Sequence, residues 1–244
     1  MFDWLFTSCP VDQQAQQWIE QRMRWLTLEF GDSLLLDAPN VTPTEEFFPD
    51  KYNATDDSAR KLVSRIGKYM HVPDSSYRLE FYSEEQNLAL VNHEGYSVSN
   101  VAAGLYGYEY GQQVIKLNRS DLPNPMAIVG TIAHEMAHAR LLGENRSPAD
   151  MFDNELITDL TVVFHGLGIF LANTPRNWRA DDQTWPGTEL RRPEYMSLPM
   201  FGYALALRSQ LRFEESPKWI KYLKGGVRSE FKQAVRYMNK RREK

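Results

Sequence analysis

The sequence contains a single cysteine among its 244 residues. One cysteine excludes an internal disulfide framework and any zinc module built from several cysteines, and it is typical of a protein in a reducing compartment. The sequence also lacks internal repeats and low-complexity tracts. Apolar residues make up 42% and charged residues 25% of the chain, which excludes wholesale disorder and a collagen-like protein.

Long hydrophobic runs are absent as well. The most apolar stretch, residues 160–172, is too short to span a bilayer and contains His165. Residues 1–10 have no basic segment, and their short apolar run is broken by Asp3, so they do not resemble a secretory signal. We therefore expect a soluble, cytoplasmic protein with no membrane partner.

Positive charge is scarce except at the C-terminus. The net charge is −4, yet residues 218–244 hold ten Lys or Arg and two Glu. An acidic body argues against a nucleic-acid partner. The tail has a basic stripe and an apolar stripe at helical spacing, made of Arg228, Lys232, Arg236 and Lys240 and of Val227, Phe231, Val235 and Met238. This pattern predicts either a docked amphipathic helix with a solvated basic face or a surface for an acidic partner.

Periodicity and capping residues predict an α+β fold. The expected helices are residues 10–30, 57–70, 124–142, 148–165, 198–211 and 227–244, and the expected strands are residues 77–82, 88–91, 101–110 and 113–117. We expect one two-lobed domain in three parts. These are N-terminal helices and a small sheet in residues 1–122, a metal-binding helix pair in residues 123–173, and a mainly helical part in residues 174–244.

One motif carries chemistry, the HExxH sequence His134-Glu135-Met136-Ala137-His138. Two histidines four residues apart lie on one face of a helix, so both imidazoles can reach one Zn²⁺ ion. The intervening Glu135 points to an adjacent side of the helix, from which its carboxylate can act as a general base. The alternative is two surface histidines on an amphipathic helix.

A catalytic zinc needs a third protein ligand. Glu155 and Asp159 lie four residues apart in an otherwise apolar segment, where unpaired carboxylates are costly. Both acids have a role if Glu155 is the third ligand and Asp159 accepts a hydrogen bond from the N–H of a ligand imidazole. The alternative places both acids at a solvated helix edge or near the helix start.

HExxH followed by a helix bearing ExxxD resembles the gluzincin zinc metallopeptidases, the thermolysin-like clan. The resemblance covers residues 112–166, whereas the third histidine of metzincins is absent. It implies a zincin-like fold with a cleft, zinc held by His134, His138 and Glu155, and Asp159 orienting a ligand histidine. It also implies hydrolysis of a peptide or protein substrate by a zinc-bound water, with Glu135 as the base.

Further candidates come from the same resemblance. In metallopeptidases of this kind an edge strand before the motif helix pairs with the substrate, and residues 114–117 are either that strand or an interior one. An oxyanion donor is expected from Tyr203 or His165, with Tyr195 also available. The alternative for Tyr203 and His165 is a role in the core, and the sequence favours that alternative for both. Residues 174–199, which include Trp178 and Trp185, are either a lid or a surface strap.

Two other functions stay open from the sequence. A non-catalytic, zinc-stabilised binding or regulatory protein would act through its basic C-terminal helix, and a closed shell of four protein ligands would favour it. A hydrolase that acts on a non-peptide bond would use the same metal chemistry.

Overall fold

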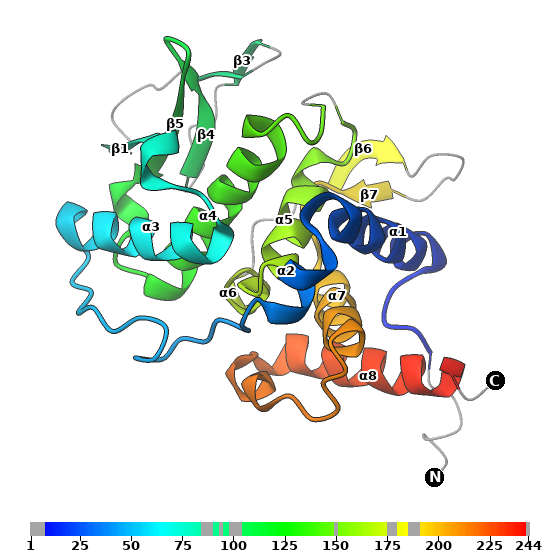
Figure 1. The fold of residues 1–244 in the computed structure, drawn as a ribbon. Helices are drawn as coiled ribbons and strands as arrows, with labels where there is room; N and C mark the ends of the chain where they lie inside the picture. The colour runs from blue at the N-terminus through cyan, green and yellow to red at the C-terminus, as the bar shows by residue number, and fades with distance from the viewer. Residues whose placement is uncertain are drawn as a thin grey trace. The chain divides into compact units, whose positions relative to one another are not determined.

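The computed structural model describes residues 8–83, 90–92, 95–97, 104–148, 151–174, 180–184 and 191–242 (Figure 1). The chain forms two compact units. The sheet unit comprises Val41–Asn154, and the helical unit comprises Met1–Asn40 together with Glu155–Lys244. The units divide the chain after residues 40 and 154, whereas the parts expected from the sequence divide it after residues 122 and 173.

The sheet unit contains a three-stranded sheet with the order β1-β5-β4. Strands β1 (Arg78–Tyr82) and β5 (Gln112–Asn118) are parallel, and β4 (Gly104–Glu109) is antiparallel to β5. A second antiparallel pair joins β2 (Leu90–Asn92) and β3 (Gly95–Ser97). Mixed helices and strands confirm the α+β expectation for the described residues.

Strand β5 lies in the middle of the three-stranded sheet. Val114, Ile115 and Leu117 are fully buried, as expected for an apolar strand that is covered on both faces. The interior alternative for residues 114–117 is therefore confirmed, and the edge-strand expectation is wrong. Buried Lys116 is held between carboxylates, with its Nζ 2.5 Å from Glu109 and 3.4 Å from Glu80.

Two helices of the sheet unit pack against each other, α3 (Asp56–Met70) and α4 (Pro125–His138). Thr55 and Ser58 form a capping box at the start of α3. At the start of α4 the Asn124 side chain accepts a hydrogen bond from the Ala127 N–H, and Pro125 occupies the first turn, as the sequence predicts. The helix also packs against β4 (Figure 1).

The helix predicted to run to Leu142 changes its hydrogen bonding after His138. Residues Ala139–Gly143 form a π-helical turn, so the α-helix ends at the last residue of the motif. Such turns are rare and occur frequently at functional sites.

The helical unit consists of six α-helices among its described residues. They are α1 (Gln13–Phe30), α2 (Asp32–Asp37), α5 (Asn154–Phe164), α6 (Gly168–Asn173), α7 (Leu198–Leu211) and α8 (Gly225–Arg242), and Asn154 of α5 is the last residue of the sheet unit. Helix α7 packs against α1, α6 and α8. Strands β6 (Ala180–Thr184) and β7 (Arg191–Pro193) form an antiparallel pair within the segment for which the sequence predicts no regular structure.

Helix α8 is the amphipathic C-terminal helix that the sequence predicts. Val227, Phe231 and Met238 are buried, and Lys232, Arg236 and Lys240 are exposed. The docked amphipathic helix is therefore confirmed, and the surface for an acidic partner stays a prediction. No helix in the described ranges is both long and apolar enough to cross a membrane.

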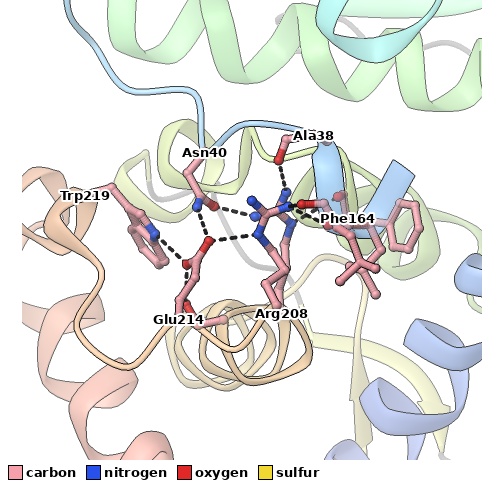
Figure 2. Close-up of polar contacts among 10 residues, drawn as sticks. Ala38, Asn40, Phe164, Arg208, Glu214 and Trp219 are labelled. Carbon is pink, nitrogen blue, oxygen red and sulfur yellow. Dashed lines mark hydrogen bonds and ion pairs between the residues drawn. The ribbon is translucent and has the colours of Figure 1, made fainter. Parts of the chain in front are cut away.

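A buried arginine joins three segments of the helical unit (Figure 2). Arg208 of α7 is only 1% exposed. Its guanidinium donates from Nε to the Phe164 carbonyl at 3.1 Å, from Nη2 to the Ala38 carbonyl at 3.0 Å, and from Nη1 to Asn40 Oδ1. The segment before Asn40 is thereby attached to the end of α5 and to α7.

Glu214 extends this network (Figure 2). It accepts hydrogen bonds from Asn40 Nδ2 at 2.8 Å and Trp219 Nε1 at 3.1 Å, and it pairs with Arg212 at 2.8 Å. Burial by itself would raise the pKa of Glu214, but hydrogen bonds from Arg212, Trp219, Asn40 and Ser209 outweigh burial and lower the pKa below 4.5. The carboxylate is thus stabilised in its charged form.

Candidate metal centre

Helix α4 presents the two motif histidines from successive turns. His134 and His138 are both buried, and their ring centroids lie 4.8 Å apart with the planes almost perpendicular. Glu135 is 5% exposed. Because α4 packs against α3 on one side and β4 on another, these polar side chains are held in a protein interior rather than on an open helix surface. The surface-histidine alternative is therefore wrong.

Glu155 joins the two histidines. It is the second residue of α5, and it is partly exposed. One ligand-type atom from each of His134, His138 and Glu155 lies within 4.8 Å of the others. Within the described ranges, no other group of three or more His, Cys, Asp or Glu side chains is arranged closely enough to hold a metal ion.

The chemistry of this group fits Zn²⁺. Two imidazole nitrogens and one carboxylate oxygen are a common donor set for a catalytic zinc, and they leave a fourth position open. In a tetrahedral shell with bonds of about 2.1 Å, ligand atoms are about 3.4 Å apart. The observed limit of 4.8 Å is larger than this value, so the three side chains would have to move closer together around the ion.

Tyr106 of β4 lies against one of these histidines. Its ring stacks on the His138 ring with centroids 6.1 Å apart and planes inclined by 17°. The Tyr106 ring also meets Tyr108 edge-on at 6.0 Å. Burial, reinforced by Tyr108, raises the pKa of the Tyr106 phenol, so it is neutral at physiological pH. Sequence reasoning missed Tyr106, because its contact depends on how β4 aligns with α4.

Gly104, the first residue of β4, approaches the general-base candidate. A Cβ atom at this position would lie 2.6 Å from Thr131 Cγ2, 2.9 Å from Glu135 Cγ and 3.0 Å from Glu135 Oε1. Only glycine allows this close approach without displacing side chains of α4. The start of β4 therefore forms a wall beside the Glu135 carboxylate, which the sequence analysis also missed.

Asp159 follows Glu155 by one turn on α5 and is fully buried. Its Oδ2 accepts a hydrogen bond from the backbone N–H of Met196 at 3.0 Å. This bond anchors the residues before α7 to α5. The expected bond from a ligand imidazole to Asp159 stays a prediction.

The two oxyanion candidates are core residues of the helical unit. The Tyr203 hydroxyl donates to Glu20 Oε1 at 2.6 Å, and burial, followed by that bond, raises its pKa. His165 is fully buried with Nδ1 2.9 Å from the Thr161 carbonyl, and its ring packs against Phe30 with centroids 5.1 Å apart. Neither belongs to the group of three ligand-type residues, and their catalytic roles stay predictions.

The remaining expected residues are Tyr195, Trp178 and Trp185. Tyr195 is partly exposed near the start of α7. Trp178 and Trp185 lie outside the described residues, so the choice between a lid and a strap stays open.

Comparison with known proteins identifies no relative. No family model matches the sequence, and neither the curated proteins nor the solved structures include a match. Evidence for the function therefore comes from the geometry of His134, Glu135, His138 and Glu155.

Proposed function

We propose that this protein is a zinc-dependent metallopeptidase with a zincin-like fold of the gluzincin kind. The observation that carries the proposal is the approach of His134, His138 and Glu155 ligand atoms to within 4.8 Å of one another. These three side chains would hold Zn²⁺. Zinc, when bound, supplies a Lewis acid that lowers the pKa of water and polarises a substrate carbonyl.

Glu135 would carry the proton in this reaction. Its carboxylate accepts a proton from the attacking water and returns it to the leaving amine, which is general acid–base catalysis. The side chain is one residue from His134 and is almost completely buried, so bulk water competes little for the proton. Asp159, buried one turn after Glu155, would orient a ligand imidazole.

The ligand count favours an enzyme over a binding protein. Structural zinc sites are closed by four protein ligands, whereas catalytic sites keep a position for water or substrate. The group in the described residues has three members. A peptide substrate is proposed because the HExxH and ExxxD pairs together resemble those of the gluzincin peptidases. A cytoplasmic location belongs to the same proposal, and it is consistent with the single cysteine.

The test is a peptide-library cleavage assay on the purified chain, followed by chelation and readdition of metal. We expect cleavage by the untreated protein, loss of cleavage after removal of the metal, and recovery with Zn²⁺ but not with Mg²⁺. Mg²⁺ prefers six oxygen ligands, so it is the control for a nonspecific salt effect. A protein that binds one zinc per chain and cleaves no peptide would contradict the proposal and favour the binding-protein alternative.

Replacement of Gly104 by alanine tests whether β4 positions Glu135. The new Cβ would lie 3.0 Å from Glu135 Oε1 and 2.6 Å from Thr131 Cγ2, so the carboxylate must move. We expect kcat to fall by about 10- to 100-fold, because small displacements of a reacting group are costly, and zinc content to stay unchanged. Gly225→Ala is the control, since its Cβ would meet no atom within 4 Å. An unchanged kcat in Gly104→Ala would show that the carboxylate does not depend on β4.

A further inference from the structure

The helical unit has a large groove that the proposed function does not use. Helices α1, α2, α7 and α8 line this groove, which has a volume of about 860 Å³. Its apolar lining includes Leu28, Leu36, Leu207, Leu211, Phe213 and Met238. None of the three candidate metal ligands contributes to it.

Apolar side chains in this groove are unusually exposed. The described residues include seven large apolar side chains that are exposed, and four of them line the groove: Leu28, Leu36, Leu211 and Phe213. Leu28 is 78% and Phe213 82% exposed. Concentrated exposure of this kind marks interaction surfaces, whereas isolated exposed leucines do not.

The backbone at Phe213 adds a second observation. Phe213 follows the end of α7 with φ +58°, in the left-handed region that favours glycine. A bulky residue in this conformation is destabilising, and the exposed ring recovers little of that free energy through burial. A glycine here would suit the fold better, and a partner that covers the phenylalanine ring would recover part of this free energy.

The charged residues of the groove indicate the sign of its ligand. Arg24, Arg241 and Arg242 line it, together with Glu20 and Asp32. Glu20 is already engaged, because it pairs with Arg241 at 2.8 Å and also accepts the Tyr203 hydroxyl. Among the described residues, no carboxylate lies within ion-pair distance of Arg24 or Arg242. The groove therefore combines an apolar floor with three arginines and two carboxylates, which is a small net positive charge.

We propose that this groove docks an amphipathic helix of a partner protein that carries acidic residues beside its apolar face. Such a helix places apolar side chains at positions i, i+3 or i+4, and i+7 into a groove. Its carboxylates lie against Arg24 and Arg242, and one apolar anchor packs on the Phe213 ring. The C-terminal turn of α8, with exposed Lys240, Arg241 and Arg242, extends the positive potential beyond the groove.

Two synthetic 18-residue peptides test the proposal on the full chain. Both carry leucines at the same amphipathic positions, and one has glutamates where the other has lysines. Fluorescence anisotropy is expected to show binding of the glutamate peptide and at least about tenfold weaker binding of the lysine peptide. Arg24→Glu combined with Arg242→Glu is expected to reverse this preference.

The Phe213→Gly variant distinguishes a loss of peptide binding caused by removal of the ring from one caused by unfolding. We expect at least about tenfold weaker binding of the glutamate peptide, with a melting temperature that is unchanged or raised. Tyr110→Gly is the matched control, because Tyr110 is another exposed aromatic residue with positive φ but lies in the β4–β5 turn. This control should leave peptide binding unchanged.

Three outcomes would overturn the proposal. Equal affinity for the two peptides, or no measurable affinity for either, would mean that the groove does not select an acidic amphipathic helix. Unchanged affinity in Phe213→Gly would show that the Phe213 ring does not bind the partner helix. Self-association of the wild-type chain in light scattering, lost in Phe213→Gly, would assign the groove to a second copy of this protein instead.

Discussion

Replacement of Glu135 by glutamine is expected to lower peptide turnover by about 10³-fold and to leave the zinc content at one ion per chain. Glutamine has nearly the same size and keeps a polar group in this buried position, so α4 and both histidines should stay in place. It cannot accept the proton of the attacking water, however, and the proposed reaction depends on that transfer. Turnover and zinc content must be measured on the same preparation. Only a loss of turnover without a loss of zinc assigns the role of general base to Glu135.

Glu45→Gln is a suitable control for this experiment. Glu45 is an exposed residue of the sheet unit, and the same loss of charge there should leave turnover unchanged. Full activity in Glu135→Gln would contradict the assigned role. Loss of zinc in Glu135→Gln would show instead that the carboxylate supports the metal ligands.

Replacement of Arg208 by methionine is expected to destabilise the helical unit by about 3–5 kcal/mol, because three buried acceptors lose their donor. Methionine approximates the length of the side chain but leaves the Phe164 and Ala38 carbonyls and the Asn40 amide without their donor. Unsatisfied buried polar groups each cost about 1–3 kcal/mol. The loss also releases the segment that ends at Asn40, since Arg208 bonds both Ala38 and Asn40 (Figure 2).

Urea denaturation of Arg208→Met against the wild type measures this effect. Arg236→Met is the control, because Arg236 is exposed on α8 and its replacement should change the unfolding free energy by less than about 0.5 kcal/mol. A loss below about 1 kcal/mol in Arg208→Met would show that water replaces the missing donor and that the network is not a major source of stability.

Local signals in the sequence predict most of the two helices that carry the candidate metal ligands. Asn124 and Pro125 mark the start of α4, and the spacing of His134 and His138 follows from helical geometry. Glu155 is predicted because a carboxylate in an apolar segment needs a partner, and its oxygen lies within 4.8 Å of both imidazoles. The start of α4 and the spacing of its histidines follow from signals within one helix, whereas the metal-binding role of Glu155 stays a prediction.

Contacts between distant segments are not predictable in this way. Tyr106 and Gly104 reach α4 through the register of β4, which no periodicity in the sequence specifies. The grouping of Met1–Asn40 with the C-terminal half depends on the packing of α1 against α7. The prediction that α5 begins at Pro148 is also wrong, because this helix begins six residues later at Asn154.

The central claim is that His134, His138 and Glu155 hold one zinc ion. Elemental analysis of the wild type and of His138→Ala, purified side by side without chelator, tests it most directly, with circular dichroism to confirm that both chains are folded. The proposed site predicts about one zinc per wild-type chain and none in the variant, since removal of one of three protein ligands opens the shell. Absence of zinc from both folded proteins, even after Zn²⁺ is offered at neutral pH, would contradict the metal centre and with it the peptidase.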